Sequence, residues 1–247
     1  MRQLLPFPVE NVVPYDVYRP DEGTDRLLRI NMVASADGHA TDPTGVTAGL
    51  GDEGDHELFR SLRALADGIL VGAETVRIEG YGPHRLRTDL AELRRRDGRP
   101  DPAAIIVVSR SLALDTQAPI FTEPKTPTIV LTCASAPAER RTRLAEATPV
   151  IVSGDETVDF TAAFDQLAER FGITHVLCEG GPTLNRALLH TGLVDELCLT
   201  ISPQLTGAPA ISIVRPPAPA ADLELLALCE QNGELFARYQ VRVDLDG

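Results

Sequence analysis

Residues 175–190 have the sequence HVLCEGGPTLNRALLH, and this stretch decides the fold class. The apolar run that ends at Cys178 is typical of a short buried strand, and two glycines then turn the chain. Pro182 suits the first turn of a helix, which the following residues continue. A strand, a tight turn and a helix form the repeating unit of α/β folds. Such a turn lets backbone N–H groups approach a phosphate, although it also occurs without a ligand.

Other segments of the chain have the same arrangement. Val71-Gly72-Ala73-Glu74-Thr75 joins an apolar strand at 69–71 to a short helix, and Ser109-Arg110-Ser111 ends a strand at 105–108. Further apolar runs predict strands, and apolar residues spaced three and four apart predict helices. These strands are expected at 27–33, 128–131 and 175–178, and the helices at 52–66, 90–96, 160–171 and 183–190.

The end of the chain has a different pattern. Segments 223–229 and 235–243 are joined by Gln231-Asn232-Gly233, and Asn-Gly is a strong signal for a β-hairpin. The whole pattern predicts an α/β fold: a single three-layer domain with a mixed, mainly parallel sheet and an antiparallel C-terminal hairpin. Residues 1–25 contain four prolines and are expected to form an extended arm, so that the domain spans residues 26–247.

The composition is that of an ordinary globular protein. Of the 247 residues, 43% are hydrophobic and 24% are charged, which excludes collagen-like, disordered and coiled-coil proteins. The net charge of -13 argues against a nucleic acid or an anionic membrane as a partner, but not against an anionic small molecule. No apolar run could span a membrane, and the four cysteines lack metal-ligand spacing. We therefore expect a cytoplasmic protein without a metal site.

Polar residues follow the predicted parallel strands. Glu179 comes directly after the strand 175–178, and Ser109 and Arg110 come after the strand 105–108. Open α/β sheets bind ligands at this edge, so these strand ends together predict a nucleotide cleft. A hydroxyl beside a guanidinium fits a monoester phosphate such as the 2′-phosphate of NADP. Each motif alone is also compatible with a simple loop.

Motifs of other enzyme classes give no support. Gly49-x-Gly51-x-x-Gly54 matches the dinucleotide fingerprint formally, but no buried strand precedes it, so a loop that enters a helix is favoured. The sequence contains no G-x-S-x-G, P-loop or H-E-x-x-H motif. It also lacks the H-x-E…P-C-x-x-C pattern of zinc deaminases.

Four groups of residues carry a family resemblance: NMVASADG at 31–38, LRA at 62–64 with DGILVGAETVR at 67–77, EGGPTL at 179–184 and GLVDE at 192–196. In this order they resemble the pyrimidine reductase family of riboflavin biosynthesis, the reductase domain of the bifunctional deaminase/reductase, with a dihydrofolate-reductase-like fold. The resemblance runs from about Leu27 to Val243. It implies an NADPH-dependent oxidoreductase, similar to 5-amino-6-(5-phosphoribosylamino)uracil reductase, that reduces the ribosyl group of an aminopyrimidine ribose 5-phosphate to ribityl.

The resemblance also implies which residues bind the cofactor. The matching positions that would contact NADPH are Val33, Ala34, Thr75, Glu79, Ser109, Gly181, Pro182, Thr183 and Leu184. Gly72, Arg110 and Gly180 join them because they belong to the same turns and strand ends.

The implied substrate site contains Thr47, Arg63 and Glu179, with Arg85 or Arg87 for the substrate phosphate. Arg63 lies one position off the apolar face of the helix 52–66, which lets its guanidinium reach a cleft. Glu179 is the first candidate to position or protonate the opening ribosylamine, and Glu79 is the second.

One loop departs from the family pattern. Glu79-Gly80-Tyr81-Gly82-Pro83 stands where the family usually has Asp-Asp-Pro, so the loop around the substrate is altered. Two alternatives therefore stay open. One is a related NADPH reductase for a pterin, a dihydrofolate-like compound or another small carbonyl. The other is a non-catalytic nucleotide-binding protein.

The apolar segment 193–201 and the Asn232-Gly233 hairpin are expected near an edge of the sheet. Exposed edges of that kind invite pairing, and lysines are absent there. Members of the family commonly dimerise, so we expect a homodimer built through the antiparallel end of the sheet. The alternative is that the arm 1–25 covers this edge within one chain.

Overall fold

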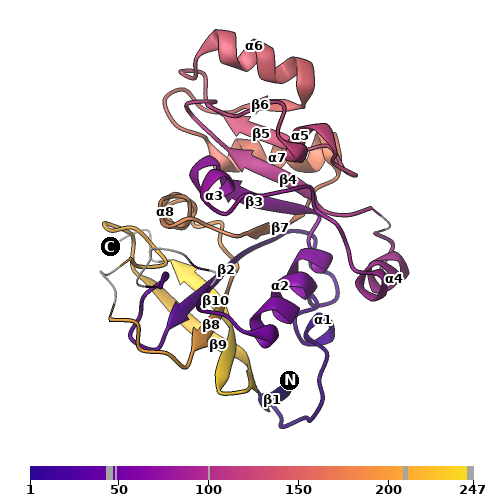
Figure 1. The fold of residues 1–247 in the computed structure, drawn as a ribbon, viewed down its shortest axis with the longest axis vertical. Helices are drawn as coiled ribbons and strands as arrows, with labels where there is room; N and C mark the ends of the chain where they lie inside the picture. The colour runs from indigo at the N-terminus through magenta and orange to yellow at the C-terminus, as the bar shows by residue number, and fades with distance from the viewer. Residues whose placement is uncertain (43–46, 48, 100, 208–210, 244–247) are drawn as a thin grey trace. The chain divides into compact units, whose positions relative to one another are not determined.

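The computed structural model describes residues 1–42, 47, 49–99, 101–207 and 211–243 (Figure 1). The chain divides into two compact units. Unit 1 consists of Met1–Leu65 and Cys178–Gly247, and unit 2 consists of Ala66–Leu177. The sequence predicts one domain over residues 26–247, since its composition changes nowhere along the chain. The contacts within the chain instead separate a continuous segment, unit 2, from the two flanking segments that form unit 1.

The described part of unit 1 contains five strands in the order β1-β9-β10-β8-β2. β8 pairs with β2 in parallel, and the other neighbours pair antiparallel. At the turn between β9 and β10, Asn232 and Gly233 both have positive φ, which is the backbone that a two-residue hairpin turn requires. The predicted hairpin is thereby confirmed. The bounds are β1 Arg2–Leu5, β2 Leu27–Ser35, β8 Glu196–Ser202, β9 Ala221–Gln231 and β10 Glu234–Val243.

At the sheet edge, the expected edge position of segment 193–201 is wrong, and the alternative that residues 1–25 cover the edge holds in part. β8, within the segment 193–201, lies between β10 and β2 and is therefore an interior strand of unit 1. β1 pairs with residues 228–230 of β9, so the first residues of the chain cover part of that edge. The reason is that β8 has a partner on each side, which its apolar sequence alone does not reveal.

Residues 1–25 are anchored on unit 1. They contain β1 and the short helix α1 (Pro14–Val17), which packs against α2. Tyr15, within α1, and Tyr18, directly after it, are fully buried. The segment is therefore a strand and a helical turn packed on the unit, and not an extended arm.

Helices α2 (Glu53–Leu65) and α8 (Pro182–Leu189) complete unit 1 and match the two predicted helices there. α2 buries Leu58, Leu62 and Leu65 on one face, as the spacing predicts. Gly54 lies in its first turn, where an added Cβ would approach the Phe236 ring to 2.8 Å. The glycines 49–54 thus serve a close helix entry, as expected.

Unit 2 contains strands in the order β7-β3-β4-β5-β6, and β3 to β6 run parallel. β3 and β4 are buried almost throughout, which is typical of parallel strands covered on both faces. The expected mixed, mainly parallel α/β architecture is confirmed. The bounds are β3 Gly68–Gly72, β4 Ala104–Val108, β5 Ile129–Thr132, β6 Val150–Val152 and β7 His175–Cys178, whose last residue belongs to unit 1.

The helices of unit 2 cover both faces of its strands. α3 lies in front of the strands in Figure 1, and α7 lies behind them. α3, α5 and α6 share one apolar cluster with β3, β4 and β5. The sequence did not predict α6 and β6. α6 buries only Leu144 and so lacks an apolar face, and β6, with three residues, is too short for a recognisable apolar run. The bounds are α3 Ala73–Ile78, α4 Thr88–Arg96, α5 Pro119–Thr122, α6 Ala138–Ala147 and α7 Phe160–Phe171. Within the described residues, every helix is too short or too polar to cross a lipid bilayer.

Candidate functional site

A partly buried ion pair forms the centre of the candidate site in unit 1. Arg63, near the end of α2, donates from Nε and Nη2 to the two carboxylate oxygens of Glu179, at 2.6 and 2.7 Å. The Glu179 side chain is 2% exposed and that of Arg63 is 19% exposed. The guanidinium also lies 4.1 Å from the centroid of the Phe59 ring. Two of the predicted substrate-binding residues are thus in direct contact.

This geometry defines what Glu179 can do. A guanidinium matches a carboxylate as a planar fork, and such a paired bond is stronger than a neutral one. Both oxygens of Glu179 already accept a hydrogen bond, so Arg63 fixes the orientation of the carboxylate. Glu179 is therefore presented as an acceptor, and donating a proton would require one guanidinium bond to be replaced.

The glycine turn after Glu179 leads into α8. Gly180 has a φ of +88°, which disfavours any residue with a Cβ, and such a Cβ would lie 3.1 Å from the Met32 sulfur. Gly181 occupies the N-cap position of α8 and provides no side chain to cap it. Main-chain donors in the first turn of a helix are the groups that bind phosphate. The turn Gly180–Leu184 therefore fits a dinucleotide pyrophosphate.

Other predicted residues of unit 1 flank this turn less directly. Val33 and Ala34 are buried near the end of β2, where they pair with Thr200 and Ile201 of β8. Thr47 is half-buried, and its hydroxyl donates to a main-chain carbonyl at 3.2 Å. These residues offer backbone groups and small side chains, with no further charge.

The predicted cofactor residues of unit 2 lie at the ends of β3 and β4. Gly72 begins α3 without a side-chain cap, Thr75 is half-buried within it, and Glu79 is exposed at its end. Ser109 is buried, and its hydroxyl accepts a hydrogen bond from the Leu112 N–H at 3.0 Å. Arg110 is exposed. Ser109 thus shapes the loop, while Arg110 offers a guanidinium suited to a phosphate.

The two arginines proposed for the substrate phosphate differ in how firmly their guanidinium groups are bound within the protein. Arg87 holds both oxygens of Asp89 at 2.7 Å, so its planar fork is engaged. Arg85 lies 3.8 Å from Glu123, and both of these side chains are more than half exposed. A loose surface pair of this kind contributes little and is easily exchanged for a phosphate. These contacts favour Arg85 over Arg87 as the residue for the substrate phosphate.

A residue that the sequence analysis missed anchors α2. Glu234, on β10, is buried and accepts hydrogen bonds from the N–H groups of Asp52 and Asp55 at 2.9 and 3.3 Å. Burial, together with a hydrogen bond to Asp52, raises the pKa of Glu234 to about 8. No local pattern reveals this role, because Glu234 and Asp52 are 182 residues apart.

The raised pKa predicts how stability depends on pH. The folded protein holds the Glu234 proton more tightly than the unfolded chain does, so this stabilisation is complete below about pH 4 and is lost as the pH rises through about 8. We expect the free energy of unfolding to fall between pH 5 and 8, and to fall less in Glu234→Gln. Urea unfolding at each pH measures both.

Asp55 has a raised pKa through burial as well, but it titrates in both proteins, so their difference isolates Glu234. Glu53→Gln, at an exposed residue in the first turn of α2, is the control and should follow the wild type. Identical slopes for the wild type and Glu234→Gln would contradict the prediction.

The fold and these contacts define an α/β protein in which a glycine turn without a side-chain cap begins a helix beside an arginine–carboxylate pair. The chain belongs to the RibD C-terminal domain family, whose family model matches residues 26–232. This confirms the resemblance seen in the sequence.

Curated relatives agree with this family. The chain is 31% identical to the 2,5-diamino-6-ribosylamino-4(3H)-pyrimidinone 5′-phosphate reductase of Archaeoglobus fulgidus, over 72% of this chain and 80% of the relative. The reductase of the same name from Aquifex aeolicus is 32% identical over 63% of this chain and 65% of the relative. The chain thus matches slightly less than two thirds of the Aquifex protein.

Solved structures show the same fold. A pyrimidine reductase-like protein from Corynebacterium diphtheriae matches 94% of this chain and 100% of its own, with 31% identity and a TM-score of 0.81. RibD from Acinetobacter baumannii matches with a TM-score of 0.68 and 20% identity, over 88% of this chain and 58% of that chain. At that identity, the second likeness concerns the fold alone.

Proposed function

We propose that this protein is a reductase of riboflavin biosynthesis that uses NADPH to reduce the ribosyl group of an aminopyrimidine ribose 5-phosphate to ribityl. The observation that carries the proposal is the partly buried Arg63–Glu179 pair beside the uncapped turn of α8, since both lie within the residues that match the family. The names of the curated relatives support the reaction.

Those names also bear on the choice of substrate. The relatives are named for a diaminopyrimidinone, which still carries its second amino group, whereas the resemblance in the sequence points equally to a uracil. We therefore propose the diamino compound as the preferred substrate. 5-Amino-6-(5-phosphoribosylamino)uracil is the competing one.

The residues divide the work of binding. When bound, NADPH supplies the hydride, and the protein supplies orientation and electrostatics. The first-turn N–H groups of α8 hold the pyrophosphate, and Gly180 allows the cofactor to approach the backbone closely. Val33, Ala34 and Thr75 line the cofactor, and Arg110 binds its 2′-phosphate. Arg85 and Thr47 bind the substrate, with Arg85 on the phosphate.

Opening of the ribosylamine to an imine requires a proton at the ring oxygen. Because both oxygens of Glu179 face Arg63, Glu179 is suited to accept a hydrogen bond from the glycosidic N–H and so to position the reacting carbon. Arg63 keeps that carboxylate in place and adds positive charge for the phosphate. Since Glu179 serves as an acceptor, the proton for the ring oxygen is assigned to Glu79, which is exposed at the end of α3.

A turnover assay tests the function. Purified protein is mixed with NADPH and one candidate substrate at a time. The candidates are the diaminopyrimidinone ribose phosphate, the corresponding uracil, dihydrofolate and a dihydropterin. Mass spectrometry measures the masses of the products. We expect a gain of two hydrogens with the first compound at the highest kcat/KM. Turnover only of a pterin or folate would favour the related reductase, and NADPH binding without any turnover would favour a non-catalytic nucleotide-binding protein.

Arg110→Ala is expected to weaken NADPH binding tenfold or more and to leave NADH binding unchanged. A charge-assisted contact to phosphate contributes about 1.5–3 kcal/mol, and NADH lacks that phosphate. Fluorescence titration with both cofactors measures the effect. Arg143→Ala, an exposed arginine on α6, is the control. Equal affinity of the wild type for NADH and NADPH would overturn the assignment.

We propose a homodimer as well, now through the part of β9 that β1 leaves uncovered. The residues of β9 that pair with β1 are 228–230, while Leu223 and Leu225 are 46% and 39% exposed. Apolar side chains beside an open strand edge favour pairing with a second copy.

Leu225→Asp is expected to convert the dimer to a monomer, because the carboxylate would lose its water on pairing. Light scattering at micromolar concentration should give twice the chain mass of 26.6 kDa for the wild type. The variant should have the mass of a single chain. Leu205→Asp, at a residue 82% exposed outside β9, is the control. A wild-type mass of one chain would contradict the dimer.

The predicted cytoplasmic location is part of the same proposal. All four cysteines are buried free thiols, as is usual in reducing compartments. Burial raises the pKa of Cys178 and of Cys198 to about 12, which keeps both in the unreactive thiol form.

A further inference from the structure

A cavity lies in unit 2, at the amino ends of its strands. It has a volume of about 370 Å³ and is bordered by residues that precede or begin β3, β4 and β5, among them Asp67, Ala104 and Ile129. The proposed cofactor residues Gly72 and Ser109 stand at the opposite ends of β3 and β4. Five strand residues separate these ends by about 13 Å. The cavity is therefore distinct from the cofactor residues of this unit.

The cavity has apolar walls. Pro127, Pro149, Phe171 and Ile173 line it, and Phe171 is 37% exposed. The flat Phe171 ring and the apolar proline rings present surfaces that suit the faces of a planar ligand. The volume lies at the small end of the range of about 300–1,000 Å³ found for small-molecule sites. It suits one or two fused rings without a long chain.

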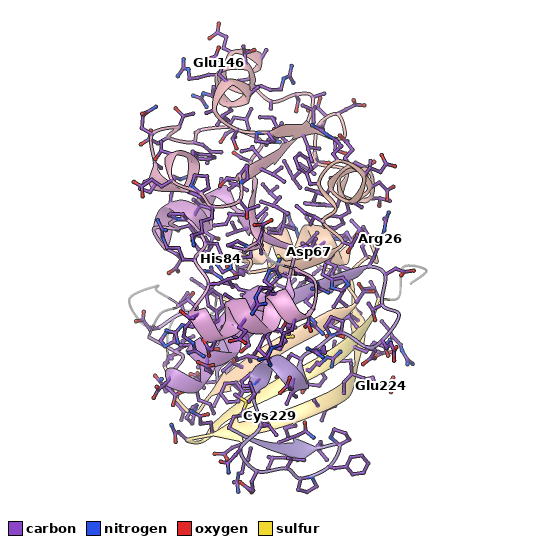
Figure 2. The ribbon with its side chains drawn as sticks, turned by 90° about the vertical axis from the view of Figure 1, so that its right-hand side faces the viewer. Arg26, Asp67, His84, Glu146, Glu224 and Cys229 are labelled. Carbon is purple, nitrogen blue, oxygen red and sulfur yellow. The ribbon has the colours of Figure 1, made fainter. Side chains whose placement is uncertain are left out.

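The polar floor is built around Asp67, which is labelled in Figure 2. Its Oδ2 accepts hydrogen bonds from the Thr174 N–H and hydroxyl and from the His175 N–H, at 2.9–3.3 Å. Its Oδ1 lies 3.8 Å from Arg99 Nε and 4.0 Å from Arg94 Nη2, beyond hydrogen-bonding distance. Among the described residues, no donor bonds this oxygen. Oδ1 thus stands between two guanidinium groups as an acceptor.

Both arginines are held in place. Arg94 is buried and donates to the carbonyls of Ala66 and Asp101 at 2.5 and 2.6 Å. Arg99 Nη2 lies 2.9 Å from His175 Nδ1, and because a guanidinium only donates, that nitrogen is the acceptor. The floor therefore presents a fixed acceptor flanked by fixed donors.

We propose that this cavity binds a planar heterocycle that carries an N–H next to a C=O, as the lactam edge of a pyrimidinedione or pteridinedione does. The ring N–H donates to Asp67 Oδ1, a guanidinium of Arg99 or Arg94 donates to the ring carbonyl, and the apolar walls cover the ring faces. The charges favour a neutral ligand, since Asp67 and the exposed Asp101 balance the two arginines. A phosphate or carboxylate would be repelled by Asp67.

The test uses lumazine, a fluorescent pteridinedione, without NADPH or substrate, so its result does not depend on the proposed reaction. The chain contains no tryptophan, so protein emission does not interfere with the titration. We expect saturable binding by the wild type. We expect binding at least tenfold weaker for 1,3-dimethyllumazine, which has the same rings but no N–H at those positions.

Two variants locate the site. Asp67→Asn places an amide donor toward the arginines, and Arg99→Met removes one cation but keeps the apolar stem, so each should weaken lumazine binding at least tenfold. Arg95→Met is the matched control, because Arg95 is exposed and paired only loosely with Glu92, at 3.9 Å. Thermal unfolding checks that each variant is folded, and Arg99→Met keeps the test valid if Asp67→Asn does not fold.

Three results would overturn the inference. The first is no saturable lumazine binding by the wild type. The second is wild-type affinity in a folded Arg99→Met protein. The third is weakening only in Glu179→Gln, which would assign lumazine to the proposed substrate site.

Discussion

Arg63→Ala is expected to lower the free energy of unfolding by about 3–5 kcal/mol, because it leaves the buried carboxylate of Glu179 without its guanidinium. Turnover should fall at least a hundredfold, because Glu179 would lose its fixed orientation. The substrate phosphate would also lose a nearby cation. Urea unfolding at pH 7 and steady-state kinetics measure the two effects.

Two further variants separate stability from catalysis. Arg60→Ala, on the same helix, removes an exposed arginine whose pair with Glu57 is 3.9 Å long, so it should change stability by less than about 1 kcal/mol. Arg63→Met combined with Glu179→Leu removes both charges of the pair and should recover stability without activity. Wild-type stability and kinetics in Arg63→Ala would show that the ion pair has neither role.

Glu196→Gln is expected to be at least as destabilising, at about 3–5 kcal/mol or more. Glu196 accepts hydrogen bonds from Arg29 at 2.7 Å and from Arg238 at 2.9 and 2.6 Å, and all three side chains are at most 9% exposed. Without the carboxylate, two buried guanidinium groups lose the charged partner to which both are hydrogen-bonded. Because whole domains are stable by only about 5–15 kcal/mol, the thermal midpoint should drop sharply.

Acid unfolding provides a second readout. Burial alone would raise the pKa of Glu196, but the adjacent Arg238 and Arg29 hold it below its usual value. This stabilisation is present above about pH 4.3 and is lost as the pH falls further, and Glu196→Gln should lack it. Glu224→Gln is the control, since Glu224, labelled in Figure 2, pairs with Arg242 on the surface. Unchanged stability of Glu196→Gln would refute the prediction.

Most of the fold was predictable because its signals are local. The apolar runs that become β2, β3, β4 and β7, the spacing of Leu58 and Leu62 in α2, and the turn at Asn232 each depend on a few neighbouring residues. The strand at 193–201 illustrates the limit. Its apolar character predicts a strand, but its place between β10 and β2 depends on partners far along the chain.

The candidate site shows the same division. The residue types of Arg63, Glu179 and the glycine turn are recognisable in the sequence, and they predict an α/β protein with a phosphate site. The sequence does not reveal that Arg63 and Glu179, which are 116 residues apart, bond each other. It therefore does not reveal the role of Glu179 as an acceptor either. It is likewise silent on the long-range contact of Glu234 with α2.

By itself, the sequence determined the strand–turn–helix units, the C-terminal hairpin and the family, because backbone preference and apolar periodicity act over a few residues. Only the tertiary structure decided which charged groups meet, that β1 covers part of the β9 edge, and that Asp67 stands between two arginines. The physical reason is that a charge or a strand edge is buried only together with a partner. That partner is chosen by packing over the whole unit and not by its neighbours in the chain.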